Sequence, residues 1–449
     1  MKAQVELFGN YVLLEKLASG GMAEIFLARP AACEGDGRLL VVKRVLPHFA
    51  NHSEFLNMFQ REIQIIMGFT HAHVVQLHDF GSVNFQPYIA MEYIEGKSLR
   101  DLGERLKATK AKMPIATALS LIAQAASGLH YAHTFENKTT GKPLNTIHRD
   151  ISPHNLIVSF DGNLKVIDFG IAKAACSVLD LTKTGTVKGK AGYFSPEQLE
   201  GKILDARSDI FSLGVVAWEL LTGEKLFAKP GDTEVSIMVK VGQCEKHVVP
   251  PSRLNKDIPG DVDRIILTAL EKDPNNRFRD ARQFQEELRK ALMKYHPDHT
   301  YADTGAIVRN LFSEDIINHR RKTQELNKYA QEMLQQDVGD ITAVIMVGGE
   351  TGQTTTEKEL ELSKTREEVV SLRLAKIESS IKQKASTRHY MLFAFYVISI
   401  IALKFGDLYH IWNDYVGTPS ASAEMTAPLA TSSSSHRGPG HSSHSSKGH

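Results

Sequence analysis

The sequence is poor in cysteine and in net charge, and each shortage excludes a class of protein. Only three cysteines occur in 449 residues, Cys33, Cys176 and Cys244, and no two of them form a CxxC pair. They build neither a disulfide framework nor a zinc knuckle, so we expect reduced thiols. Lysine and arginine total 53 against 52 aspartates and glutamates. A chain so balanced is not a globally basic nucleic-acid binder, and we expect no nucleic-acid partner.

The N-terminus also lacks the apolar core of a signal peptide, because Glu6 and Glu15 interrupt its first hydrophobic stretch. We therefore expect the N-terminal part of the chain to stay in the cytoplasm. A length of 449 residues allows about three domains and a sizeable buried core.

Residues 11–294 carry most of the regular patterning. Strand-like runs such as YVLLEKL and LLVVKRVL come mostly first, and helical periodicity such as ALSLIAQAASGLHYAH comes mostly later. This order favours two packed units, an α+β arrangement, over one alternating sheet. Residues 1–10 form a lead-in. Residues 295–340 space their apolar side chains as an amphipathic helical extension, which we expect to pack on the larger unit.

Composition changes beyond the extension. Residues 341–389 combine a flexible linker with a charged, helix-prone stretch that contains a short heptad rhythm. A homodimer formed through a coiled coil and a solvated single helix are both compatible with so short a seam. Residues 413–449 are rich in serine, glycine and histidine and are expected to be a disordered tail.

Between these two segments, residues 390–412 are nearly long and apolar enough for one transmembrane helix, provided that Lys404 extends toward the interface. Basic residues precede this segment and aromatic residues bracket it, which favours an N-terminal unit on the cytoplasmic side, anchored in the inner (cell) membrane. The alternative is a buried or surface-lying amphipathic helix.

A glycine-containing hairpin near the N-terminus is the first candidate binding element. Such a hairpin between two strands can place backbone N–H groups over nucleotide phosphates. Its glycine pattern is incomplete, because Ala18 and Ala23 stand where a GxGxxG loop has its outer glycines, and a plain β-turn is the alternative. The candidate residues are Leu17, Ala18, Ser19, Gly20, Gly21, Met22, Ala23, Glu24 and Ile25.

Charged residues farther along the chain indicate phosphate chemistry. Lys43 lies in an apolar strand, where an unpaired ammonium is costly, so it requires an anion. Glu62 falls on the polar side of a following helix and is a plausible partner. Asp150, Asn155 and Asp168 offer the hard oxygen ligands and the base that magnesium-dependent phosphoryl transfer requires.

Taken in order, the motifs GGMAEIFLAR, VVKR, MEYIEG, HRDISPHN, DFG, YFSPEQ, SDIFSLG and DPNNRF resemble those of bacterial eukaryotic-like (Hanks-type) serine/threonine protein kinases. The resemblance covers residues 11–294. It implies a bilobal protein-kinase fold, with a small antiparallel-β lobe that carries one main helix and a large, mainly helical lobe. It also implies transfer of the ATP γ-phosphoryl group to Ser or Thr hydroxyls of protein substrates, with Mg²⁺.

Carried over by position, the resemblance implies a role for each catalytic motif. Lys43, paired with Glu62, would hold the ATP phosphates. Asn155 and Asp168 would bind Mg²⁺, and Asp150 would orient and deprotonate the substrate hydroxyl.

Two further roles follow from the same resemblance. The hinge, Met91, Glu92, Tyr93 and Ile94, would bind the adenine edge through its backbone, with Met91 as gatekeeper. Glu197 and Arg277 would form the ion pair that holds the end of the activation segment.

Two positions depart from the family pattern. Ser152 stands where a lysine is usual, and Lys190 stands where a threonine is usual. We interpret this as an exchange of hydroxyl and ammonium across the site, with Lys190 neutralising the transferred phosphoryl group. The alternatives are a weakened kinase, a nucleotide-binding pseudokinase that acts as a membrane-tethered scaffold, and specificity for tyrosine hydroxyls.

The segment between DFG and SPE indicates regulation. Thr182 and Thr184 are candidate autophosphorylation sites, and a phosphate there could pair with Arg149 and order the loop. Cys176 in the same segment is interpreted as a spectator thiol.

Overall fold

The computed structural model describes residues 5–21, 23–32, 38–47, 59–60, 63–137, 140–169 and 190–346, the last twelve of these as backbone only. The chain divides into two compact units after Ile345, and the described residues lie almost entirely in the first.

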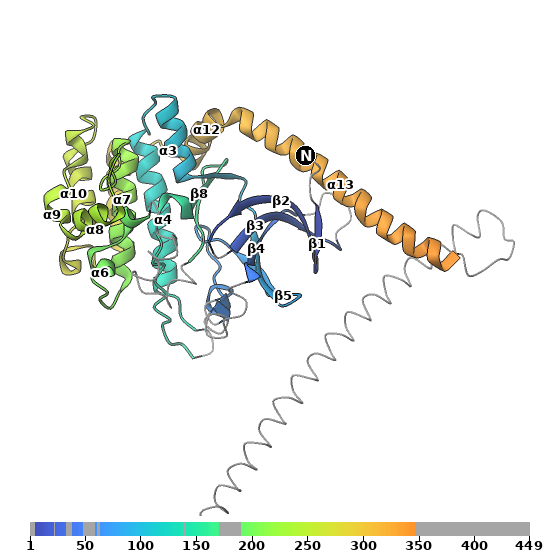
Figure 1. Ribbon diagram of the computed structural model, residues 1–449. Helices are drawn as coiled ribbons and strands as arrows, with labels where there is room; N and C mark the ends of the chain where they lie inside the picture. Colours follow the sequence, from blue (N-terminus) through green and yellow to red (C-terminus); the bar gives the residue numbers. More distant parts are fainter. Residues whose placement is uncertain are drawn as a thin grey trace, which may run out of the picture. The chain divides into compact units, whose positions relative to one another are not determined.

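A six-stranded antiparallel sheet forms the small lobe (Figure 1). Its strands alternate between two buried faces, since Leu13 belongs to one apolar cluster and its neighbours Val12 and Leu14 belong to another. In the order in which they pair, the strands are β1 (Glu6–Phe8), β2 (Tyr11–Ser19), β3 (Ala23–Pro30), β4 (Leu40–Val45), β6 (Gln86–Glu92) and β5 (Leu77–Val83).

Helices and a small three-stranded sheet form the large lobe. Its central helices, α4 and α7, are buried over nearly their whole circumference, as their almost continuous apolar runs require. The helices are α3 (Leu99–Ala108), α4 (Ile115–His133), α6 (Pro196–Leu199), α7 (Ala206–Thr222), α8 (Glu234–Gly242), α9 (Cys244–His247), α10 (Gly260–Ala269) and α11 (Ala281–Tyr295). The 3-10 turns are η1 (Pro153–Asn155), η2 (Ala191–Tyr193), η3 (Pro251–Arg253) and η4 (Pro274–Asn276), and the sheet consists of β7 (Gly96–Ser98), β8 (Leu156–Ser159) and β9 (Leu164–Val166). The α+β, two-lobed fold expected from the sequence is therefore confirmed.

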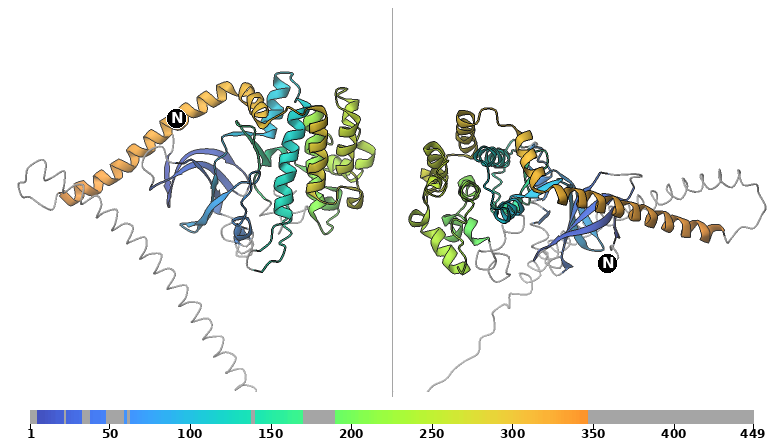
Figure 2. Two further views of the ribbon diagram at one scale, coloured as in Figure 1. Left: turned by 180° about the vertical axis from the view of Figure 1, so that it is seen from behind. Right: turned by 90° about the horizontal axis from the view of Figure 1, so that it is seen from above.

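Two further helices follow α11. The first, α12 (Tyr301–Leu311), packs on the large lobe, where Gly305 lies against the backbone of Phe160. The second, α13 (Ser313–Met346), continues onto the small lobe, and its buried Leu326 and Ala330 share an apolar cluster with β2 and β3 (Figures 1 and 2). The sequence led us to expect the extension on the larger unit, and α13 departs from this because its apolar stripe covers a face of the sheet that would otherwise be exposed.

Within the described ranges, no helix combines the length and the apolar character needed to cross a membrane. The segment 390–412 lies outside these ranges, as do most of 341–389 and all of 413–449.

Candidate active site

A buried carboxylate fixes the loop that carries HRDISPHN. Asp209, on α7, is 1 % exposed and accepts the backbone N–H groups of His148 and Arg149 at 2.8 and 2.9 Å. His133 Nε2 bonds to the same carboxylate at 2.8 Å. Burial alone would raise the pKa of Asp209, but these bonds outweigh it and leave that pKa below its ordinary value. The buried carboxylate of Asp209, which accepts three hydrogen bonds, thus anchors the loop.

His148 links this loop to the DFG segment. Burial lowers the pKa of His148, so the ring is neutral near pH 7. Its Nε2 lies 3.0 Å from the carbonyl oxygen of Ile167, which requires a proton on Nε2. Its Nδ1 then accepts the backbone N–H of Asp150 at 3.2 Å. Since Phe169 also packs on the His148 ring, the loops that carry Asp150 and Asp168 are held together.

The side chains of Asp150, Asn155 and Lys190 converge on one point. Lys190 Nζ donates to Asp150 Oδ2 at 2.8 Å, and Asn155 Nδ2 donates to the same oxygen at 3.0 Å and to the Asp150 carbonyl at 2.7 Å. Asp150 is only 11 % exposed, so this ammonium acts where solvent screening is reduced. The predicted proximity of Lys190 to Asp150 is therefore present in the structure.

Ser152 does not complete the exchange by a direct contact. Its side chain is fully buried, and its hydroxyl has no hydrogen-bond partner among the described residues. The hydroxyl that stands in place of the usual lysine thus lies buried within the HRDISPHN loop, while Lys190 supplies a positive charge to Asp150.

Lys43 lies on β4 between Ile25 of β3 and Ile89 of β6, and its ammonium forms an ion pair with Asp168. The anion that Lys43 requires is thus the carboxylate of Asp168, in the DFG segment. Glu62, the partner that the sequence suggested, lies outside the described residues, as do Met22, Cys176, Thr182 and Thr184. Asp168 has φ 62°, an uncommon backbone conformation for a residue other than glycine.

The glycine-containing hairpin joins β2 to β3, with Ser19 opposite Glu24 and the N–H of Gly20 donating to the carbonyl of Ala23 at 2.9 Å. Residues from Leu17 to Gly21 are exposed at its tip, as a loop that covers a ligand must be. The Glu24 carboxylate bonds to Lys16 and Arg44, and these contacts, that of Lys16 first, lower its pKa. Only the backbone of Glu24 is therefore available to a nucleotide.

The hinge residues span the end of β6: Met91 and Glu92 are its last two residues, and Tyr93 and Ile94 follow it. Met91 pairs with Val41 of β4 and Leu77 of β5 and packs against the main core, where a gatekeeper belongs. The Glu92 N–H donates to the Gln76 carbonyl at 3.0 Å, and its carboxylate binds Lys165 at 2.7 Å. The hinge backbone left for an adenine edge is therefore the Glu92 carbonyl and the peptide groups of Tyr93 and Ile94.

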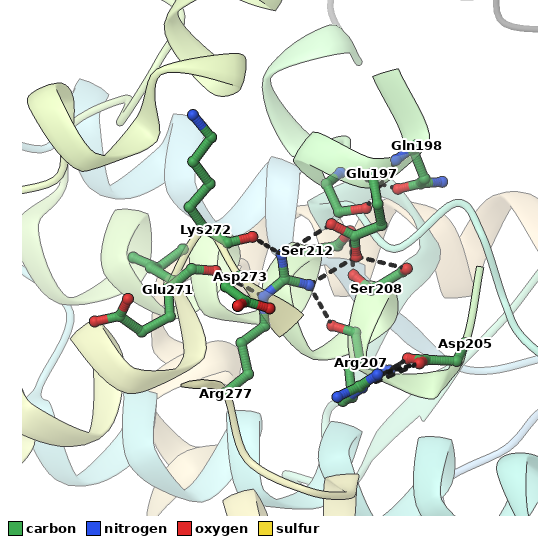
Figure 3. Close-up of polar contacts among 12 residues, drawn as sticks. Glu197, Gln198, Asp205, Arg207, Ser208, Ser212, Glu271, Lys272, Asp273 and Arg277 are labelled. Atoms are coloured by element: carbon green, nitrogen blue, oxygen red, sulfur yellow. Dashed lines mark hydrogen bonds and ion pairs between the residues drawn. The ribbon is translucent and has the colours of Figure 1, made fainter. Parts of the chain in front are cut away.

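Glu197 and Arg277 form the predicted ion pair (Figure 3). The Arg277 guanidinium donates to both carboxylate oxygens, at 2.7 and 2.9 Å, and Ser208 donates to one of them at 2.7 Å. The remaining guanidinium donors reach the backbone carbonyls of Arg207, Glu271 and Lys272. A fully buried cation is thus surrounded by acceptors, as burial of a charge requires.

Two contributors to the site were not assigned by sequence reasoning. Asp209 lies in the motif SDIFSLG, but no role was assigned to it from the sequence. An aspartate in an apolar helix nevertheless indicates a buried charge that needs partners. Lys165, which holds Glu92, gave no signal because it occupies an ordinary strand position.

The residues present fit a magnesium nucleotide. Magnesium is usually bound through one or two protein oxygens and the substrate phosphates. Asp168 supplies a carboxylate. Because the amide nitrogen of Asn155 is used by Asp150, its amide oxygen is the atom that can face a metal. Lys43, the exposed hairpin and the hinge backbone would hold the phosphates and the adenine.

A two-lobed fold with this arrangement of lysine, aspartates and asparagine between its lobes defines a protein-kinase-type phosphotransferase site. Comparison with known proteins agrees: the protein kinase domain matches residues 11–288, and the chain belongs to that family.

The relatives compared below are bacterial proteins. The chain is 38 % identical to tyrosine-protein kinase MasK of Myxococcus xanthus, over 71 % of this chain and 48 % of MasK. It is 36 % identical to serine/threonine-protein kinase PknB of Mycobacterium leprae, over 66 % of this chain and 44 % of PknB. It is also 36 % identical to serine/threonine-protein kinase PrkC of Bacillus subtilis, over 63 % and 41 % of the two chains. The resemblance to bacterial Hanks-type kinases is thus confirmed, and the chain spans less than half the length of these relatives.

Proposed function

We propose that the protein is an ATP- and Mg²⁺-dependent protein kinase that phosphorylates hydroxyl groups of protein substrates in bacterial signal transduction. Two sets of polar contacts carry the proposal. Lys43 pairs with Asp168. Asp150 bonds to Asn155 and Lys190, on a loop that Asp209 anchors. A scaffold that only bound nucleotide would have no use for a base held by two donors.

The chain's own residues account for the transfer step. Mg-ATP supplies the phosphoryl group. Asp150 accepts the proton of the acceptor hydroxyl, and Asn155 holds the Asp150 carboxylate in position. Lys190 places a positive charge where negative charge increases in the transition state.

Serine and threonine are the proposed acceptors, since PknB and PrkC are named serine/threonine kinases. Tyrosine is the second candidate, favoured by the missing lysine at Ser152 and by MasK, a relative named as a tyrosine kinase. Phosphoamino-acid analysis of the reaction product separates the two acceptors.

Thr182 and Thr184 are the proposed autophosphorylation sites. Arg149 is positioned to receive the phosphate, because its backbone is fixed by Asp209 while its buried Nε has no partner among the described residues. Pairing with a phosphate would satisfy that donor and order the segment.

The test is mass spectrometry of the full chain after incubation with Mg-ATP, beside Asp168→Ala and Asp150→Asn variants. We expect phosphate on Thr182 or Thr184 only in the unmodified chain. Bound Mg-ADP with no phosphate in any sample would overturn catalysis and favour the scaffold.

Membrane anchoring through residues 390–412, with the kinase domain in the cytoplasm, and a homodimer through 357–388 belong to the same proposal. The support is the sequence pattern alone. Fractionation of cells that express the full chain or a chain lacking 390–412 tests the anchor, and recovery of both in the soluble fraction would refute it. Light scattering of the purified chain tests the dimer.

A further inference from the structure

Helix α13 contacts the hinge region and strand β2, and Figure 2 shows it running along the small lobe. His319 Nε2 lies 2.6 Å from the hydroxyl of Tyr93, a hinge residue. One position on, Arg320 binds Glu95, just beyond the hinge, at 2.8 Å. Lys322 binds Glu15, on the β2 strand that leads into the glycine-containing hairpin, at 2.7 Å. A single helix thus contacts both the hinge and the strand that leads into the glycine-containing hairpin.

Of these three contacts, the one between His319 and Tyr93 is shielded from solvent. Tyr93 packs against the apolar cluster formed by β2, β3 and α13, which includes Leu14 and Leu326. Burial raises the pKa of Tyr93 to about 12 and lowers the pKa of His319, so both groups are neutral near pH 7. The Arg320–Glu95 pair is 62 % and 43 % exposed, and exposed ion pairs contribute little.

The preceding helix, α12, contacts the turn between β8 and β9. Arg309 on α12 donates to the Phe160 carbonyl, and Gly162 is so close to α12 that an added Cβ would lie 1.9 Å from the Tyr301 carbonyl oxygen. Both contacts fall on the turn between β8 and β9, the strands that connect Asn155 to Asp168. The extension therefore touches the hinge, strand β2 and the turn between the strands that join Asn155 to Asp168.

We infer that His319 is a positioning residue for nucleotide binding, and that helices α12 and α13 form part of the frame of the ATP site. The inference rests on the proposed function. His319 acts through Tyr93: it fixes the ring, and thereby the hinge peptide groups on either side of it. Any event that lifts α13 from the hinge would lower nucleotide affinity, which makes the extension a route by which a signal reaches the site.

The experiment compares four full-length chains: the unmodified chain, His319→Ala, His319→Gln and Arg321→Ala. Glutamine keeps a polar group near the position of Nε2, and Arg321 is an exposed neighbour whose guanidinium donates to Asn318 of the same helix. The dissociation constant of Mg-ADP is measured by calorimetry, and KM for ATP and kcat are measured in parallel.

We expect His319→Ala to raise the Mg-ADP dissociation constant and KM roughly three- to tenfold, the range that corresponds to the loss of one neutral hydrogen bond, with kcat at saturating ATP nearly unchanged. His319→Gln should recover most of the affinity, and Arg321→Ala should match the unmodified chain. An unchanged dissociation constant in His319→Ala, with or without a lower melting temperature, would overturn the inference. Failure of the unmodified chain to bind Mg-ADP would instead refute the proposed function and the inference with it, and binding without transfer would refute only catalysis.

Discussion

Lys190 bonds to the Asp150 oxygen that Asn155 also reaches, so that oxygen is fixed by two donors of different kinds. Asn155 orients the carboxylate without altering its charge. Lys190 adds a full positive charge in a site where Asp150 is nearly buried. The orientation of the base and the electrostatics of transfer are thus assigned to separate residues, and single substitutions can separate them.

Replacing Lys190 by methionine, which keeps the length and removes the charge, should lower kcat about 100-fold, the scale reported for loss of one preorganised donor, with little change in KM for ATP. Lys190→Arg should retain more activity because it keeps the charge. Initial rates at saturating Mg-ATP measure the effect, with the exposed Lys202 replaced by methionine as the control. Full turnover in Lys190→Met would show that the ammonium is not used in transfer.

The pair of Glu197 and Arg277 should make stability depend on pH. Burial alone would raise the pKa of Glu197, but the bonds from Arg277 outweigh it and lower the pKa below the ordinary 4.5. The stabilisation is therefore present above about pH 4.5 and is lost as the pH falls through the lowered pKa of the folded protein.

Glu197→Gln should consequently lower the free energy of unfolding by about 3–5 kcal/mol near neutral pH, because it leaves Arg277 buried without a counter-ion. The difference from the unmodified chain should shrink in acid. Urea unfolding at several pH values measures it. Glu286→Gln, which breaks the exposed pair with Arg282, is the matched control. It should lower the free energy of unfolding by less than about 1 kcal/mol. A difference that does not change with pH would contradict the assigned cause.

At the scale of elements, the contact between α12 and the β8–β9 turn depends on two glycines. Gly162 has φ +86°, and Gly305 lies against the backbone of Phe160 and Asp161. A side chain at either position would separate α12 from the strands that connect the two metal ligands. The close approach explains why the extension begins with a helix that carries a glycine on its buried face.

Gly162→Ala should therefore lower the free energy of unfolding by more than the left-handed backbone conformation alone accounts for. Gly231 offers a matched control, since it has φ +90° and nothing within 4 Å of an added Cβ. Gly231→Ala should cost about 1–2 kcal/mol for the left-handed conformation. Gly162→Ala should cost roughly 1–3 kcal/mol more for overpacking against Tyr301. Denaturant unfolding of both variants tests this. Equal losses of unfolding free energy would show that α12 shifts away from the added side chain at little cost.

For the whole molecule, the sequence predicted the site better than the packing that surrounds it. Lys43 in an apolar strand and the oxygen-bearing HRDISPHN and DFG segments could be assigned because their chemistry is local and their order is specific. Asp168 forms the ion pair with Lys43, whereas Glu62 lies outside the described residues.

The position of α13 could not be predicted in the same way. Its apolar residues show only that one helix face must be covered, not which surface covers it. The contact of Leu326 with Val12 and Leu14 joins positions some three hundred residues apart, and no periodicity within either segment identifies the other. The assignment of the extension to the larger lobe was therefore right for α12 and wrong for α13.

The same helix should make the two lobes unfold together. Leu326 is 5 % exposed and packs on strands of the small lobe, whereas Ile317 of the same helix is 67 % exposed. Leu326→Asp should destabilise the small lobe by at least the roughly 2–5 kcal/mol typical of losing a buried leucine, because it also places a charge against an apolar face. In calorimetry, we expect a small-lobe transition at lower temperature, separate from that of the large lobe, while Ile317→Asp keeps the unmodified profile. If Leu326→Asp melts in one unshifted transition, other contacts, such as the core that both lobes share, couple the lobes, and α13 is bound too weakly to transmit a signal to the nucleotide site.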